Sequence, residues 1–209
     1  MRPAGAVLDG AAERSTIRSR TVGTVDDELV VLLGEDGRPT GTLPKRLTHH
    51  ADTPLHLGFS CYVFDPRGRL LVTRRAVGKP SFGGVWTNTV CGHPGPGEPH
   101  AAAVARRARF ELGVGVRSVT AALPRFRYRA EQGGVVENEW CPVYLAVTDD
   151  EPAGEPSEVE EHRWTTWEQF LTDSRADPGT WSPWCREQAV QLEAAGLVTA
   201  FRAQVVAAA

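Results

Sequence analysis

Two short segments with reactive side chains at alternate positions restrict the fold of this chain more than any other feature. In the segment NTVCGHPG, Cys91 precedes His93 by two residues, and in VENEWCP, Glu137 precedes Glu139 by the same spacing. Alternate side chains of an extended segment point to one side, so each pair is predicted to face a cavity. A fold that satisfies both segments brings a thiol, an imidazole and two carboxylates together.

Two further histidines extend this set of reactive groups. His49 and His56 lie seven residues apart in the segment THHADTPLH, which favours a shared site over two solvated loop histidines. Imidazoles and carboxylates bind divalent cations, and a thiol beside them can transfer protons. Two carboxylates on one strand face would also repel each other without a cation. The residues therefore predict a metal site beside Cys91.

Composition indicates one globular enzyme domain rather than a nucleic-acid-binding or membrane protein. A chain of 209 residues that is 41% hydrophobic can bury one core. The net charge of -3 gives no reason to expect nucleic acid or an anionic membrane as a partner. No apolar run approaches the roughly 18 residues of a membrane span, and we expect a cytoplasmic protein. Four widely spaced cysteines argue against disulfides, and all except Cys91 are expected in the core: Cys61, Cys141 and Cys185.

Lysine is rare in this chain. Of 23 basic residues only Lys45 and Lys79 are lysines. A lysine kept in so biased a sequence indicates a position that needs a compact ammonium group rather than a planar guanidinium. With two instances, chance is the competing explanation.

The pattern of apolar and turn residues predicts an α/β domain at 25–200, after a flexible extension at 1–24 and before a tail at 201–209. The clearest helix covers residues 99–112, with Pro99 in its first turn and Gly113 as its C-terminal cap. We expect further helices at 166–171 and 183–195, and strands at 28–33, 59–64, 69–74, 85–90 and 135–147.

The segment from Gly92 to Val114 resembles the Nudix box, a loop-helix-loop whose glutamates gather divalent cations around a diphosphate. Its departures are Arg107, in place of a glutamate, and Phe110, in place of the first of two adjacent glutamates. Arg107 and Glu111 are one helical turn apart, and by themselves they favour a solvated salt bridge. With fewer carboxylates, diphosphate binding through one cation is expected to survive while hydrolysis is lost.

A more specific resemblance covers residues 28–190. The segments GTLPK, HHADTPLH, LVTRRA, GVWTNTVCGHP, RFELGV, FRYRA, VENEWCPV and WSPW follow the order and spacing of the type I isopentenyl-diphosphate Δ-isomerase family. The resemblance implies a Nudix-type α/β/α sandwich around a mixed β-sheet. It also implies an enzyme that interconverts isopentenyl and dimethylallyl diphosphate.

The resemblance implies a role for each matching residue. Cys91 and Glu139 would be the catalytic pair, and Glu111 would hold the Mg²⁺ that bridges the diphosphate. A second divalent metal, Mn²⁺ or Zn²⁺, would have five ligands: His49, His56, His93, Glu137 and Glu139. The residues near the phosphates would be Lys45, Arg75, Lys79 and Arg107. Pro44 and the long N-terminal extension depart from the family pattern, but neither touches a reactive position.

Shifting a double bond requires an acid on one side of the alkene and a base on the other. Glu139 is expected to be the acid, with Tyr128 hydrogen-bonded to it or relaying the proton, and Cys91 is the opposing group. Trp184 can present its indole face to the cation-like centre, although simple packing of the C-terminal helix explains it almost equally well.

Two other functions compete with isomerisation. One is a Nudix hydrolase of a nucleoside or other diphosphate, which the missing box glutamates disfavour. The other is a Nudix-like binding module without activity, which the complete set of acid, base and ligands disfavours. The metal at the His/Glu site and the choice between a monomer and a dimer stay open at this stage.

Overall fold

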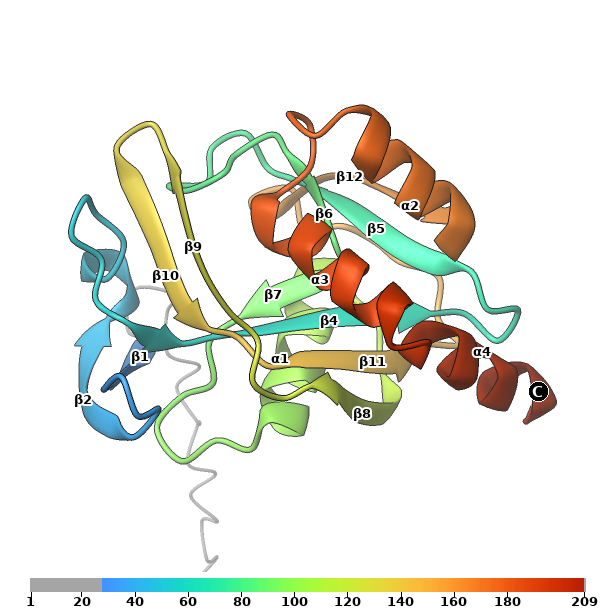
Figure 1. The fold of residues 1–209 in the computed structure, drawn as a ribbon, viewed down its shortest axis with the longest axis horizontal. Helices are drawn as coiled ribbons and strands as arrows, with labels where there is room; N and C mark the ends of the chain where they lie inside the picture. The colour runs from blue at the N-terminus through green and yellow to red at the C-terminus, as the bar shows by residue number, and fades with distance from the viewer. Residues whose placement is uncertain (1–27, 209) are drawn as a thin grey trace, which may run out of the picture.

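A computed structural model describes residues 28–208, in which two β-sheets lie beside four α-helices (Figure 1). The expected extension at 1–24 lies outside the described residues. The smaller sheet has the strand order β2 (Pro39–Pro44), β1 (Leu29–Leu33), β3 (His56–Leu57), β10 (Val135–Trp140), β9 (Arg127–Gln132). The larger sheet has the order β12 (Val159–Thr165), β5 (Leu70–Arg75), β4 (Phe59–Phe64), β11 (Val143–Val147), β8 (Arg117–Leu123). Two short strands extend it, since β6 (Trp86–Thr87) pairs with β5 and β7 (Val90–Gly92) pairs with β4.

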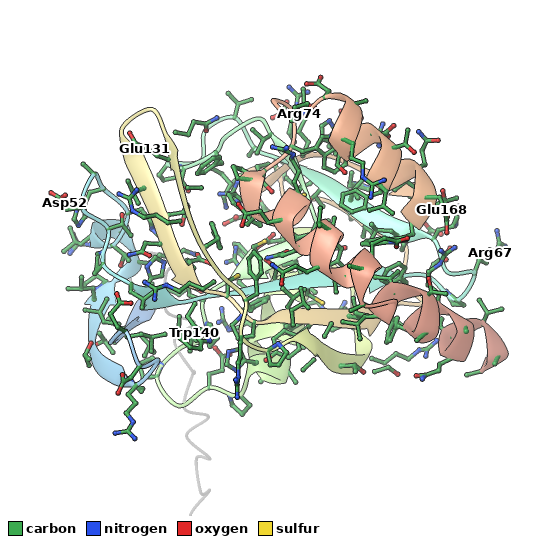
Figure 2. All side chains as sticks on the ribbon, in the orientation of Figure 1. Asp52, Arg67, Arg74, Glu131, Trp140 and Glu168 are labelled. Atoms are coloured by element: carbon green, nitrogen blue, oxygen red, sulfur yellow. The ribbon has the colours of Figure 1, made fainter. Side chains whose placement is uncertain are left out.

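Helices cover both faces of the larger sheet, which confirms the predicted α/β/α sandwich. On one face Phe59, Cys61 and Val63 pack with α1 (His100–Leu112). On the other face the alternate residues Tyr62 and Phe64 share a core with the last three helices: α2 (Trp167–Ala176), α3 (Pro183–Ala194) and α4 (Leu197–Ala207). Alternate residues of β4 therefore pack into two separate cores, one on each face of the sheet. Among the labelled residues of Figure 2, the exposed charged side chains lie at the rim: Asp52, Arg67, Glu131 and Glu168.

The strand and helix predictions hold where local signals are strong. The strand predicted at 59–64 matches β4, and the turn after it is closed by Gly68, whose φ of 76° suits glycine. Helix α1 runs from His100 to Leu112, with Pro99 as its N-cap and Gly113 in the left-handed conformation at its C-terminal end. Both sheets are mixed, because β3 pairs with β10 and β4 with β11 in parallel while the other pairs are antiparallel.

The single strand predicted at 135–147 is wrong. It is two strands in two different sheets, because the chain leaves β10 after Trp140 and enters β11 at Val143. Pro142 lies in the crossing, where its missing N–H removes a donor that a continuous strand would need. The strand predicted at 85–90 is likewise divided into β6 and β7.

The predicted tail at 201–209 is also wrong over most of its length, because α4 continues to Ala207. Phe201 and Val205 of this helix are buried, and the Phe201 ring lies 5.8 Å from that of Phe64. The helix predicted at 166–171 continues to Ala176. No helix among residues 28–208 is long and apolar enough to cross a membrane.

The burial of α4 predicts that its apolar face stabilises the domain. We expect Phe201→Ala to lower the free energy of unfolding by about 3–5 kcal/mol, the usual cost of truncating a buried phenylalanine. Val206→Ala is the matched control, since Val206 is 55% exposed on the same helix. Urea unfolding followed by circular dichroism measures both. An effect of Phe201→Ala no larger than that of Val206→Ala would contradict the packing of α4.

Candidate active site

A cavity of about 290 Å³ collects nearly all the residues that the sequence singled out. Eleven of the thirteen candidates line it: Lys45, His49, Arg75, Lys79, Cys91, His93, Arg107, Tyr128, Glu137, Glu139 and Trp184. The other two lie directly behind this lining. His56 Nε2 is 3.6 Å from Glu139, and Glu111 is 2.6 Å from Arg107. The structure therefore brings these distant segments together around one cavity.

Strand register explains why three of the candidate residues meet. Glu139 of β10 lies opposite His56 of β3 on one side and Tyr128 of β9 on the other. Directly opposed residues project from the same face of a sheet, so these three side chains are neighbours. Gly58 supplies the space for them, because a Cβ at position 58 would collide with the Glu139 carboxylate.

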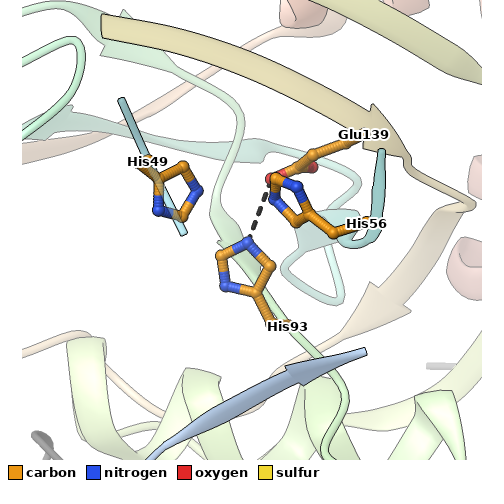
Figure 3. Close-up of side chains that lie close together, drawn as sticks. All are labelled: His49, His56, His93 and Glu139. Atoms are coloured by element: carbon orange, nitrogen blue, oxygen red, sulfur yellow. Dashed lines mark hydrogen bonds and ion pairs between the residues drawn. The ribbon is translucent and has the colours of Figure 1, made fainter. Parts of the chain in front are cut away.

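Three imidazoles and one carboxylate converge to form a candidate metal centre (Figure 3). One ligand atom from each of His49, His56, His93 and Glu139 lies within 4.8 Å of all the others. The ring centroids are 5.0–5.3 Å apart, and His93 Nε2 is 3.1 Å from Glu139 Oε1. These residues come from the loop before β3, from β3, from the segment after β7 and from β10.

The polar atoms of this cluster fit a divalent cation. His49 Nε2, His56 Nε2 and Glu137 Oε2 are buried without a hydrogen bond of acceptable geometry, although His49 Nε2 is 3.2 Å from Glu137 Oε2. Buried nitrogen and carboxylate atoms that face one another without hydrogen bonds are costly unless a cation joins them. Glu137 lies beside the four-residue group rather than within it, since its carboxylate contacts His49 and Ser81.

Burial and mutual charge set the protonation of this cluster. Burial lowers the pKa of His93 to about 4, so its imidazole is neutral at pH 7 and can donate a lone pair. Burial acts against the charge of Glu139, but the hydrogen bond from His93 and the proximity of His56, whose Nε2 lies 3.6 Å away, outweigh it and hold the pKa of Glu139 well below its usual range. Burial likewise opposes protonation of His56, yet the Glu139 carboxylate raises the pKa of His56.

Cys91 enters the cavity from β7 in the larger sheet, whereas Glu139 enters from β10 in the smaller one. Burial raises the pKa of the Cys91 thiol to about 11, so the thiol is protonated at neutral pH. Its sulfur contacts the Ser60 hydroxyl at 3.5 Å and donates to Asn88 Oδ1 at 3.3 Å. The other three cysteines are buried in the core, as predicted.

Three of the basic residues that line the cavity are paired with carboxylates. Lys45 Nζ is 2.6 Å from Glu28, and Lys79 contacts Glu158. Arg107 contacts Glu111 at 2.6 Å and Glu158 at 3.2 Å.

The solvated salt bridge favoured by residue spacing for Arg107 and Glu111 is therefore wrong. The pair is buried, with Arg107 4% and Glu111 8% exposed, because α1 turns this side toward the cavity. Phe110, the other departure from the Nudix box, lies on the outside of the helix and is 41% exposed.

Aromatic side chains form the apolar wall of the cavity. Trp184 is 2% exposed, and its ring lies 5.3 Å from Tyr128 and 5.0 Å from Phe82. The Arg75 guanidinium carbon is 5.7 Å from the centre of the Trp184 ring. Trp184 thus packs the core and lines the cavity at once. Burial raises the pKa of Tyr128 well above its ordinary value, so its hydroxyl keeps its proton.

The sequence analysis missed four residues that line the cavity or contact a residue that lines it: Glu28, Arg46, Ser81 and Glu158. Glu158 lies in the acidic run SEVEEH, and nothing local distinguishes it from the exposed Glu160 and Glu161. Its role as the partner of both Lys79 and Arg107 depends on the packing of α1 against the loop before β12.

Known proteins resemble this chain closely in sequence. The NUDIX domain family matches residues 54–185. Isopentenyl-diphosphate Delta-isomerase of Saccharopolyspora erythraea is 54% identical over 166 residues, which cover 79% of this chain and 86% of that protein. The Agromyces mediolanus enzyme of the same name is 56% identical over 163 residues, 78% of this chain and 79% of its own length. This chain belongs to the isopentenyl-diphosphate Delta-isomerase family, within the NUDIX domain family.

Solved structures share the fold at lower identity. DR0079 from Deinococcus radiodurans has a TM-score of 0.60 at 21% identity, over 78% of this chain and 98% of its own. The MUTT protein from Methanosarcina mazei has a TM-score of 0.55 at 16% identity, over 69% and 97%. The two likenesses confirm the Nudix fold for this member of the isomerase family.

The close approach of Gly58 to Glu139 predicts a metal-binding defect without loss of any ligand. We expect Gly58→Ala to push the carboxylate away from His56 and His93, and to weaken Mn²⁺ or Zn²⁺ binding roughly 10- to 100-fold. Gly41→Ala is the control, because a Cβ there meets nothing within 4 Å. Titration with each metal provides the measurement. Unchanged affinity in Gly58→Ala would show that Glu139 is not a ligand.

Proposed function

We propose that this protein interconverts isopentenyl diphosphate and dimethylallyl diphosphate as an isomerase of isoprenoid biosynthesis. The observation that carries the proposal is the entry of Cys91 and Glu139 into one cavity from two different sheets. The basic residues around Arg107 line the same cavity. The names of the relatives that are more than 50% identical support the same reaction.

The reaction adds a proton at one carbon of an unactivated alkene and removes another two carbons away. Glu139 donates the proton to the terminal carbon, and Cys91 accepts the proton released from the other side of the cation-like centre. In the reverse direction the two groups exchange roles. In the free protein the high pKa of Cys91 keeps the thiol protonated and the low pKa of Glu139 keeps its carboxylate ionised, which are the forms that the reverse direction requires. The forward direction requires the proton on Glu139 instead.

Tyr128 and Trp184 assist the protonation step, Tyr128 through Glu139 and Trp184 by stabilising the transient positive charge. The Tyr128 hydroxyl, on the strand beside Glu139, stays protonated and can hydrogen-bond that carboxylate or relay its proton. Trp184 presents an indole ring in the wall of the cavity, and a ring face stabilises a nearby cation by its quadrupole. Together these side chains exclude water, which would otherwise trap the cation-like centre.

The chain's residues also fit two divalent cations. His49, His56, His93 and Glu139 would hold one, Mn²⁺ or Zn²⁺, with Glu137 beside them as a fifth ligand. Glu111 would hold Mg²⁺ against the diphosphate, whose oxygens would contact Lys45, Arg75, Lys79 and Arg107. A bound cation supplies positive charge that orients Glu139 and tunes its proton affinity.

The altered Nudix box disfavours hydrolysis. A hydrolase of this type gathers several carboxylates on the helix to bind metals and activate water. Here position 107 carries a buried arginine and position 110 an outward phenylalanine, so Glu111 is the one box carboxylate on this part of α1 that reaches the cavity residues. The helix is equipped to hold an anion rather than to cleave it.

Two further expectations belong to this proposal. The protein would act in the cytoplasm, on a small-molecule diphosphate and without a nucleic-acid or membrane partner. We expect it to do so as a monomer, with a dimer as the alternative.

The proposed reaction predicts incorporation of solvent hydrogen. Incubation with isopentenyl diphosphate in heavy water should yield deuterium-labelled dimethylallyl diphosphate, detected by NMR, because the transferred protons exchange with solvent between turnovers. Unlabelled substrate with free phosphate would instead indicate a diphosphate hydrolase. Tight binding without turnover would indicate a binding module.

The division of labour in the catalytic pair predicts two different defects. Cys91→Ala removes a proton-transfer group but no metal ligand, so turnover should fall by ~10²–10⁴-fold with metal content unchanged. Glu139→Gln should lower metal content and turnover together, because this residue serves both. Cys61→Ala is the control, since Cys61 packs in the core on the α1 side of β4. Metal content and rate are measured on the same samples, and an active Cys91→Ala protein would refute the mechanism.

A further inference from the structure

A set of fully buried polar side chains lies behind Cys91, on the side away from the metal ligands. Ser60, Tyr62, Asn88 and Gln188 are each 0% exposed. They come from β4, the segment between β6 and β7, and α3. Burying polar groups in a core costs free energy unless they are hydrogen-bonded, and an apolar core would avoid the cost altogether. A buried polar set beside a reactive sulfur therefore calls for a functional explanation.

Asn88 contacts the sulfur in a fixed orientation. Its amide nitrogen donates to the backbone carbonyls of Cys61 and Val90, both at 3.1 Å. The amide oxygen therefore faces the Cys91 thiol at 3.3 Å and can only accept a hydrogen bond. Asn88 thus offers a partner to the thiol but none to a sulfur that has lost its proton.

Ser60 supplies the partner that Asn88 cannot. Gln188 Nε2 donates to Ser60 Oγ at 3.0 Å, which occupies one lone pair of the hydroxyl and leaves its proton free to donate. The hydroxyl lies 3.5 Å from Cys91 Sγ and equally 3.5 Å from Cys141 Sγ. A Cys91 sulfur that has given up its proton is charged, so it is the stronger acceptor of the two. The sulfur is therefore held between an acceptor and a donor, so it has a partner whether or not it carries a proton.

The amide of Gln188 has a second hydrogen-bond partner, Tyr62. The Tyr62 hydroxyl lies 3.1 Å from both Gln188 Oε1 and the Cys185 carbonyl oxygen and shares its one proton between these acceptors, so both ends of the Gln188 amide have a partner. Gln188 contacts neither the cavity nor any metal ligand. The hydrogen-bonded route from Gln188 to Cys91 therefore runs through the hydroxyl of Ser60.

We propose that Ser60 and Gln188 are positioning residues for the Cys91 sulfur, with Gln188 acting through Ser60. The inference rests on the proposed role of Cys91 in proton transfer. Their function is to keep the sulfur aimed at the substrate carbon through a complete turnover. Misplacement of a reacting atom by about 1 Å can cost on the order of 10²-fold in rate, so loss of this support should slow the chemical step without weakening substrate binding.

The experiment compares Ser60→Ala, Gln188→Met and the double variant by steady-state kinetics with isopentenyl diphosphate. We expect kcat to fall roughly 10- to 100-fold in each single variant, with KM and metal content within about twofold of wild type. The double variant should be no slower than the slower single variant, because both changes remove support carried by one hydrogen-bonded chain. Ser174→Ala is the matched control, since Ser174 is a buried serine of α2 that bonds the Leu171 carbonyl.

Each outcome decides a part of the inference. Wild-type kcat in Ser60→Ala would overturn it, and this variant removes a single oxygen, so it remains informative if Gln188→Met does not fold. Multiplicative losses in the double variant would overturn the route through Ser60. A fall in kcat matched by Ser174→Ala would reveal a loss of stability instead of positioning. Failure of the proposed function would look different: wild type would not isomerise the substrate, or Cys91→Ala would keep its turnover.

Discussion

The active site depends on two adjacent segments that cross together from the smaller sheet to the larger one. One runs from β3 through Gly58 into β4, and the other runs from β10 through Pro142 into β11. They stay hydrogen-bonded while they cross, with Gly58 N donating to Trp140 O at 2.9 Å and Ser60 N donating to Pro142 O at 3.1 Å. The candidate ligands His56 and Glu139 lie before the crossing, and Ser60, which contacts the Cys91 sulfur, lies after it. The two halves of the site are therefore fixed relative to each other by backbone pairing.

This arrangement explains why some features could be predicted from sequence and others could not. Helix α1 and strand β4 have strong local signals, a proline and a glycine at the ends of one and an unbroken apolar run in the other. The break between β10 and β11 has one weak signal, Pro142, within a run that otherwise reads as continuous strand. Which sheet each half joins is decided by partners some 80 residues earlier, β3 and β4. The final helix has an alanine-rich sequence that suits a tail, and its burial is a property of the tertiary fold.

The site residues show the same contrast between local sequence signals and long-range contacts. The candidate ligand and proton-transfer residues form compact local patterns, so they could be proposed from the sequence alone, and the structure brings most of them around one cavity. Ser60, Gln188 and Glu158 could not, because each acts through a contact with a residue distant in the chain: Cys91 for Ser60, Ser60 for Gln188, and Lys79 for Glu158. A buried glutamine in a helix has the same sequence signature as a solvent-facing one.

Charge balance around α1 connects the altered Nudix box with the need for a cation. Lys45, Lys79 and Arg107 are already paired with Glu28, Glu158 and Glu111, so these six side chains have no net charge before any anion enters. Arg46 and Arg75 add two positive charges at the wall of the cavity. A diphosphate carries more negative charge than two arginines can compensate, and in a largely buried site the excess is costly. A divalent cation beside Glu111 would remove that excess.

With a glutamate at position 107 instead, the same place would hold three carboxylates and would gather cations rather than an anion. Under the proposed function, Arg107 makes this face of the Nudix helix suited to holding a diphosphate intact while the alkene reacts elsewhere in the cavity, rather than to metal-assisted cleavage.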